Sequence, residues 1–178
     1  SARRESFSAV IARNGGKPVE AQAEAKEGEE KEKFTSRSWG AVFCEVRVDE
    51  ALGRISVPRI VASYIVGRLL NAKLARSQLL GGLVWGVSMA LLEETIVDPR
   101  NGHVVNANLA EYHVPVNADI GTIDVSFIEE NDTNFNPLGI RGIGEIGITG
   151  IPAAIANAVY HATGKRVRAL PIQLDDLL

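Results

Sequence analysis

The chain has 178 residues, of which 46% are hydrophobic and 23% are charged, and its net charge is −3. This length suits one domain with a real core or a piece of something larger, and the composition is that of an ordinary soluble protein. Because the charge is slightly negative and no apolar stretch reaches transmembrane length, we expect neither a nucleic-acid partner nor a membrane partner.

The first part of the chain is expected to form a helix tail followed by a flexible linker. Residues 6–13 have the pattern of a helix end, whereas half of residues 14–33 are charged and none is aromatic. A segment of this composition cannot bury enough apolar surface to fold by itself. We therefore divide the chain into residues 1–38 and a single domain over residues 39–178.

Apolar side chains begin to alternate with polar ones at Trp39, which predicts two strands joined by a turn over residues 49–54. Pro58 places the second strand at a sheet edge or at a bulge. Cys44 is the only cysteine and lies on the apolar face of the first strand, so we expect a buried structural thiol. The apolar positions are Val42, Cys44, Val46 and Val48 in the first strand and Ile55, Val57, Val61 and Ile65 in the second.

A long helix is predicted next, capped by Asn71 and continuing to about Glu94. Two adjacent glycines, Gly81 and Gly82, lie inside it, and each costs about 1 kcal/mol relative to alanine. We therefore expect another segment to lie close against the helix at this point. The predicted apolar face is Leu80, Leu83, Val84, Val87 and Leu91.

Three further short elements follow the helix. Residues 95–105 predict a small hairpin, residues 123–127 a half-buried strand, and residues 167–172 a short final strand. Strands and helices do not alternate regularly along the chain. The predicted fold class is therefore α+β, with a mixed β-sheet and helices packed on one face.

A run of glycines surrounds one carboxylate, Glu145, ahead of a final helix. Glycine permits positive φ angles and close approach of a ligand to the backbone. Pro152 fits the first turn of that helix and Gly164 fits its C-terminal cap. Glu145 is therefore expected at a helix N-terminus, where amides and the helix dipole favour anions. The glycines are Gly139, Gly142, Gly144, Gly147 and Gly150, and the apolar face of the helix is Ile148, Ile151, Ile155, Val159 and Ala162.

Three interpretations of this loop compete. The first is a plain glycine-rich turn with a solvated glutamate. The second is a dinucleotide-binding fingerprint, because residues 142–147 read G-x-G-x-x-G, but no buried strand precedes them and too little chain follows for a βαβ unit. The third is a catalytic carboxylate held against a bound cofactor.

A resemblance supports the third interpretation. The runs G-I-R-G-I-G-E-I-G and A-A-I-A-N-A-V-Y-H-A-T-G-K-R-V-R-A-L-P-I resemble the C-terminal part of the molybdopterin-binding large subunit of the molybdenum hydroxylases, the xanthine dehydrogenase and aldehyde oxidase family. Three earlier blocks occur in the family's order: W-G-A-V-F-C-E-V-R-V-D, A-R-S-Q-L-L-G-G-L-V-W-G and N-L-A-E-Y-H-V-P-V-N-A-D. Ile146 and Gly147 follow the glutamate where many members have two prolines, a form similar to bacterial aldehyde-oxidising enzymes.

The resemblance implies roles for particular residues. Glu145 is expected to be the catalytic base that deprotonates the molybdenum-bound hydroxide. Ala72 stands where proline is common in the family, and no protein side chain is expected to bind the metal, since the three histidines lack metal-ligand spacing. The expected cofactor-binding residues are Arg68, Leu69, Leu70, Asn71, Ala72, Lys73, Leu74, Gln78, Arg141, Gly142, Ile143 and Gly144.

The resemblance also implies a cofactor, substrates and partners. The cofactor is expected to be molybdenum-molybdopterin cytosine dinucleotide, with 2Fe-2S and FAD on partner subunits, and the substrate an aldehyde or N-heterocycle oxidised with water-derived oxygen. The preceding part of the large subunit is another expected partner, so this chain alone should be inactive. The alternative is a non-catalytic interaction module that retains only the fold. The cytoplasm is favoured over the periplasm.

Overall fold

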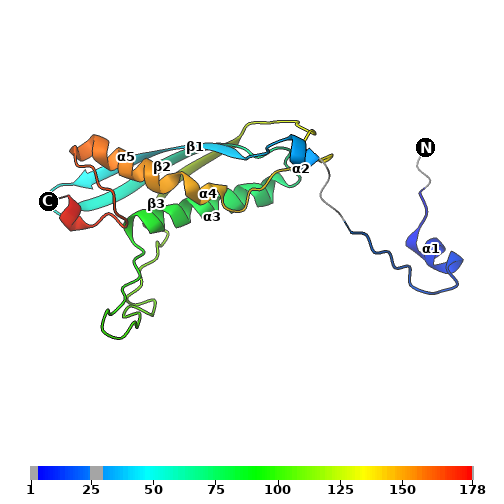
Figure 1. Cartoon of the computed structure of the whole chain (residues 1–178), viewed down its shortest axis with the longest axis horizontal. Helices are drawn as coiled ribbons and strands as arrows, with labels where there is room; N and C mark the ends of the chain where they lie inside the picture. Colours follow the sequence, from blue (N-terminus) through cyan, green and yellow to red (C-terminus); the bar gives the residue numbers. More distant parts are fainter. Residues whose placement is uncertain (1–3, 25–29, 178) are drawn as a thin grey trace.

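The computed structural model describes residues 4–24 and 30–177. The expected helix tail is present as α1, which lies away from the main body, and a short α2 occurs near the end of the predicted linker (Figure 1). Residues 1–3 and 25–29 of the predicted first segment lie outside the described residues. The elements are α1 (Phe7–Arg13), α2 (Glu30–Lys33), β1 (Trp39–Asp49), β2 (Arg54–Ile65), α3 (Ala72–Leu91), β3 (Ile120–Phe127), α4 (Ile146–Thr149), α5 (Ile151–Thr163) and the 3-10 helix η1 (Leu174–Asp176).

The described strands form one mixed sheet in the order β1-β2-β3. β1 and β2 are antiparallel and β2 and β3 are parallel, while α3 and α5 lie along one face (Figure 1). The side chains of β1 that face these helices, such as Val42 and Cys44, are partly buried, whereas Phe43 on the opposite face is 70% exposed. The predicted α+β fold with helices on one face is therefore confirmed.

Pro58 lies at a bulge of the central strand β2. Val57 and Pro58 together stand opposite Val46 of β1, because Glu45 pairs with Arg59 whereas Arg47 pairs with Ser56. The bulge alternative is thus correct and the edge alternative is wrong. The extra residue reverses which side chains face the helices, so Val61, predicted on the buried face, is 38% exposed. The buried positions after the bulge are Ile60, Ala62 and Tyr64.

The capped helix α3 begins as predicted and ends at Leu91, three residues earlier than expected. The Asn71 side chain accepts a hydrogen bond from the Leu74 amide at 3.0 Å. The close approach is confirmed at Gly82, where an added Cβ would lie 2.9 Å from the Gly147 Cα, but Gly81 faces open space. The buried face is rotated relative to the prediction, so that Leu80 and Val84 are only half-buried. Its fully buried large side chains are Leu79, Leu83 and Val87.

The final helix α5 follows its prediction except at two positions of the apolar face: Ala162 is exposed, and Ile148 lies in the preceding helix α4. Ile151, Ile155 and Val159 are fully buried, and Gly164 ends the helix with a φ of 74°. Each buried isoleucine or valine contributes about 1.5–3 kcal/mol relative to an exposed one. Glu145 does not precede this helix directly, because the separate four-residue helix α4 intervenes.

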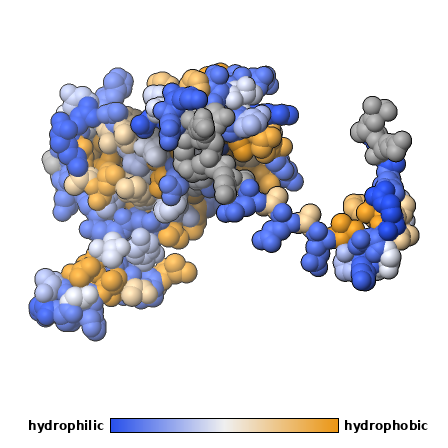
Figure 2. All heavy atoms as spheres, turned by 45° about the vertical axis from the view of Figure 1, so that its right-hand side comes forward, coloured by the Kyte–Doolittle hydropathy of each residue, from blue (hydrophilic) through white to orange (hydrophobic). Residues whose placement is uncertain are grey.

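The other two predicted elements are weaker than expected. The hairpin over residues 95–105 reduces to one bridge between Val97 and Val104, within an arm over residues 93–119 that projects from the body (Figure 1). Figure 2 shows apolar side chains at the surface of this arm, where Leu109 is 82% exposed. The predicted strand at residues 167–172 is wrong. This segment is an irregular loop. Its Ile172 side chain packs into the core, and the Ile172 amide donates a hydrogen bond to the Ala90 carbonyl at 2.8 Å.

Among the helices of the described residues, none has both the length and the apolar character that crossing a membrane requires.

Candidate functional site

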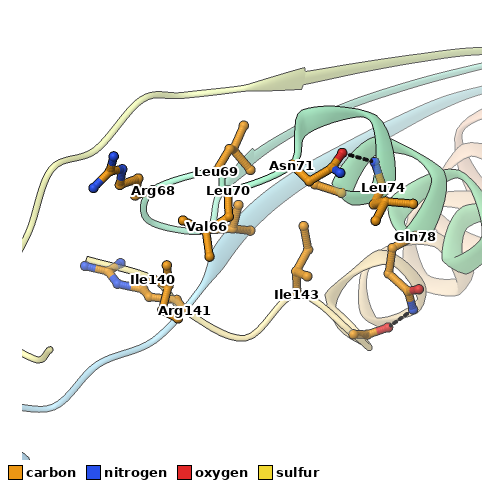
Figure 3. Close-up of a pocket in the computed structure, with 12 residues that line it drawn as sticks. Val66, Arg68, Leu69, Leu70, Asn71, Leu74, Gln78, Ile140, Arg141 and Ile143 are labelled. Carbon is orange, nitrogen blue, oxygen red and sulfur yellow. Dashed lines mark hydrogen bonds between the residues drawn. The ribbon is translucent and has the colours of Figure 1, made fainter. Parts of the chain in front are cut away.

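A cavity of about 430 Å³ lies between the loop over residues 66–71, the first turns of α3 and the loop over residues 140–144 (Figure 3). Nine of the twelve residues predicted to bind a cofactor line it, whereas Ala72, Lys73 and Gly142 do not. The nine are Arg68, Leu69, Leu70, Asn71, Leu74, Gln78, Arg141, Ile143 and Gly144, and the lining also includes Val66, Ala75 and Ile140. Ala75 could have been found from the sequence, because it lies one turn after Asn71 on the same helix face.

Two glycines let the loops meet. Gly67 and Ile140 form an antiparallel bridge, and the Arg68 amide donates to the Gly139 carbonyl at 2.7 Å. A Cβ on Gly67 would lie 2.4 Å from the Gly139 oxygen, and both glycines have positive φ, 71° and 66°. Larger side chains would therefore separate the two walls of the cavity.

The second loop is shaped by Asn136. Its side-chain oxygen accepts hydrogen bonds from the Leu138 and Ile140 amides, and its Nδ2 donates to the Ile140 carbonyl at 2.7 Å. Within the glycine run that follows, positive φ is confined to Gly139. Gly147 is needed for a different reason, since its Cβ would lie 3.0 Å from the Leu79 carbonyl oxygen of α3.

The N-terminus of α3 opens at the cavity. The first intrahelical hydrogen bond runs from the Ala75 amide to the Asn71 carbonyl, and the Asn71 side chain caps Leu74. The amides of Ala72 and Lys73 precede that bond, and amides at this position commonly bind anions with the help of the helix dipole. Although their side chains lie outside the lining, these two residues can still contribute through the backbone.

The Arg141 guanidinium is engaged by protein groups. It pairs with Glu130 at 2.9 Å and with Asp132 at 3.1 Å, and it donates to the Arg37 carbonyl at 2.8 Å. Only 11% of the Arg141 side chain is exposed. A hydrogen bond from the Asn134 amide, and then the Arg141 guanidinium, hold the pKa of Asp132 below its usual range although partial desolvation opposes them. Arg141 therefore borders the cavity as a neutralised cation.

Glu145 lies in a second hollow of about 430 Å³ beside the first. The two hollows share Leu74, Gln78 and Gly144, and the Gln78 Nε2 donates to the Gly144 carbonyl at 2.7 Å between them (Figure 3). Glu145 stands at the N-terminus of α4, is exposed, and makes no capping hydrogen bond with its side chain. Its carboxylate is thus open to solvent or to a ligand. The rest of the second hollow is lined by Ser77, Gly81, Gly82, Trp85 and Ile148.

Within residues 4–24 and 30–177, no three His, Cys, Asp or Glu side chains lie close enough together to hold a metal ion. The first hollow offers apolar walls, backbone amides, the side-chain amides of Asn71 and Gln78, and the Arg68 guanidinium. This donor set fits an organic cofactor that carries anionic groups better than a metal bound directly by side chains.

Comparisons with known proteins agree with this geometry. Residues 2–121 match the family described as "Molybdopterin cofactor-binding domain". The chain belongs to this family. It is 46% identical over 145 residues to the "Aldehyde oxidoreductase molybdenum-binding subunit PaoC" of Escherichia coli (strain K12), covering 82% of this chain and 20% of that subunit.

Two further relatives widen the comparison. The "Putative xanthine dehydrogenase molybdenum-binding subunit XdhA" of Escherichia coli (strain K12) is 36% identical over 135 residues, which cover 76% of this chain and 18% of that subunit. The solved aldehyde oxidoreductase from Desulfovibrio gigas superposes with a TM-score of 0.70 at 29% identity, covering 79% of this chain and 15% of that protein. The chain therefore spans a fifth or less of the length of these relatives. The resemblance to the xanthine dehydrogenase and aldehyde oxidase family is confirmed.

Proposed function

We propose that this chain forms one wall of the cofactor cleft in the large subunit of a molybdopterin-dependent oxidoreductase. The observation that carries the proposal is the convergence of nine expected cofactor-binding residues on one cavity, with Glu145 in the adjoining hollow. The two hollows meet at the hydrogen bond from Gln78 to the Gly144 carbonyl. The cofactor and the Glu145 carboxylate would then lie in adjoining hollows that share Leu74, Gln78 and Gly144.

The residues around the cavity fit such a cofactor. The amides of Ala72 and Lys73 at the start of α3 would bind its phosphate groups, and Gln78 would donate to or accept from the pterin edge. Residues 141–144 would contribute mainly backbone. We further propose the cytosine dinucleotide form of the cofactor. Partner subunits carrying 2Fe-2S and FAD, and the rest of the large subunit, would complete the enzyme.

When bound, the cofactor supplies the two-electron oxidation of an aldehyde or N-heterocycle with oxygen derived from water. Glu145 acts as a general base in this proposal: its carboxylate accepts the proton of the attacking oxygen. The exposed position of Glu145 in the second hollow leaves its oxygens free for this task. The hydrogen bond from the Gln78 side chain to the Gly144 carbonyl fixes the residue that precedes Glu145.

The substitution Glu145→Gln in the complete enzyme tests the proposal. Glutamine keeps the shape of the side chain but cannot accept the proton, so turnover should fall by about 10²–10⁴-fold. Molybdenum and pterin content should stay the same, and the acid limb of the pH–rate profile should disappear from the residual activity. Glu50→Gln in the β1–β2 turn is the matched control and should have no effect. Activity within about threefold of wild type would contradict the general-base role.

A non-catalytic interaction module is the second candidate. The projecting arm favours it, since side chains such as Leu109 and Val116 are largely exposed there. Elemental and pterin analysis of the complete subunit separates the two functions. Stoichiometric molybdenum with pterin supports the enzyme, and absence of both supports the interaction module.

A further inference from the structure

We infer that Arg141 is a positioning residue that acts through Glu145, four residues further along the chain. This inference rests on the proposed role of Glu145 as the base. The charge of Arg141 is paired with Glu130 and Asp132. The side chain fixes the glycine-rich segment on which Glu145 is carried.

Arg141 already has several partners within the protein. Its guanidinium pairs with Glu130 and Asp132, both in the segment after β3, and donates to the carbonyl of Arg37, just ahead of β1. The side chain is 11% exposed. The two carboxylates outnumber this cation at about 3 Å, so the cluster carries a net negative charge that disfavours a cofactor phosphate. The side chain therefore serves the protein itself.

A second hydrogen bond joins the same two segments beside Arg141. The Ser38 hydroxyl donates to the Gly142 carbonyl at 2.6 Å, while Arg141 donates to the carbonyl of Arg37. Two neighbouring residues of the loop are thus joined to two neighbouring residues ahead of β1. The hydrogen bonds run in opposite directions, so the loop can neither slide nor rotate at this point without breaking one of them.

Two glycines lie in the chain between this anchor and Glu145. Gly142 and Gly144 have open space around the position of a Cβ, so side-chain packing does not restrain either of them. Gln78 holds the Gly144 carbonyl from α3. Two polar anchors, Arg141 and Gln78, therefore hold the chain just ahead of Glu145, alongside the packing of Ile143 and Ile146 against the core. Loss of one anchor would loosen the backbone at Gly142 and Gly144, where no side chain packs.

Displacement of a catalytic group by about 1 Å can cost about 10²-fold in rate. Removing Arg141 also leaves Glu130 and Asp132 close together without the cation between them, which repels the loop ends further. We expect Arg141→Met in the complete enzyme to lower kcat by about 10–10²-fold with unchanged KM and unchanged molybdenum content. Arg141→Lys should restore only part of kcat, because lysine keeps the positive charge but lacks the planar guanidinium that can bind several acceptors at once.

A double-mutant cycle with Glu145→Gln tests whether Arg141 acts through Glu145. If it does, adding Arg141→Met to Glu145→Gln produces no further fall in kcat. Equal fold losses in both backgrounds would overturn the inference, and so would molybdenum content that falls in proportion to activity, which would make Arg141 a cofactor ligand. If Glu145→Gln alone leaves kcat unchanged, the proposed function fails instead.

Two more variants complete the design. Arg59→Met removes an ion pair of similar length, 2.9 Å to Asp124, on the open face of the sheet, and should leave kcat unchanged. Ser38→Ala removes the hydrogen bond to the Gly142 carbonyl and no charge. If the Arg141→Met enzyme does not assemble, Ser38→Ala replaces it in the double-mutant cycle. The expected loss of kcat is then smaller, and it should again be absent in the Glu145→Gln background. Wild-type kcat in Ser38→Ala would then overturn the inference.

Discussion

The core beneath the sheet and the loops around the two hollows are held together by different forces. Ile151, Ile155 and Val159 are fully buried against α3 and the sheet, and the side chains around them are almost all apolar. The loops depend on single polar side chains, such as Asn136 and Gln78, each bonded to backbone. A typical net hydrogen bond contributes about 1 kcal/mol, whereas one buried aliphatic side chain contributes about two or three times as much. The stability of the chain and the geometry of its site should therefore respond to different substitutions.

The largest effect on stability is expected in the core. Ile155→Ala removes a fully buried side chain of α5 and should lower the free energy of unfolding by about 2–5 kcal/mol. Leu109→Ala on the projecting arm is the control, because Leu109 is 82% exposed and its loss should change stability by less than about 0.5 kcal/mol. Denaturant titration of the chain measures both. Equal effects would show that the arm is as well packed as the core.

A smaller effect on stability but a clear effect on cofactor content is expected at the partition between the hollows. Gln78→Ala removes the hydrogen bond to the Gly144 carbonyl and should cost about 1 kcal/mol in stability. In the complete enzyme it should lower molybdenum content and rate together, since the same amide is proposed to face the pterin. Gln173→Ala is matched to it, because Gln173 donates its side chain to Glu94 at 3.0 Å away from both hollows. Unchanged molybdenum content in Gln78→Ala would contradict the cofactor contact.

Sequence patterns predicted the core well because its elements carry strong local signals. The cap at Asn71, the apolar face of α5 and the end at Gly164 all follow from residues within one element. The bulge at Pro58 was foreseen as one of two alternatives, but its consequence for Val61 was not. A strand's buried face depends on the register with its neighbour, which periodicity within the strand does not contain.

The candidate site was also predicted only in part. The resemblance indicated nine residues of the cavity, but it did not indicate what fixes the loops. The partners of Arg141 are Glu130, Asp132 and the carbonyl of Arg37, which is 104 residues away along the chain. No local sequence motif predicts a contact between residues so far apart in the chain. The role of Ser38 was missed for the same reason, since it lies at the end of a segment that composition marks as a linker.

The smallest effect concerns Cys44, which lies where the apolar side of β1 meets a groove beside α5. Burial raises the pKa of its thiol to about 11 because the thiolate loses hydration. At neutral pH the side chain is therefore a thiol, and iodoacetamide should modify it much more slowly in the folded chain than in denaturant.

The same pKa shift gives a small pH dependence of stability with a definite sign. In the unfolded chain a cysteine ionises at about pH 8.5, whereas folded Cys44 stays protonated until about pH 11. The unfolded state therefore loses its proton first, and stability should fall as pH rises from about 8.5 toward 11. Burial also raises the pKa of Tyr64 to about 12, so tyrosine ionisation in the unfolded chain adds a slope of the same sign above about pH 9. Cys44→Ala should therefore remove the slope between about pH 8.5 and 9. Denaturant titrations of both chains across that window measure the difference. If the folded thiol is instead alkylated as fast as the unfolded one at pH 8, Cys44 is solvated and belongs with the open surface rather than with the core.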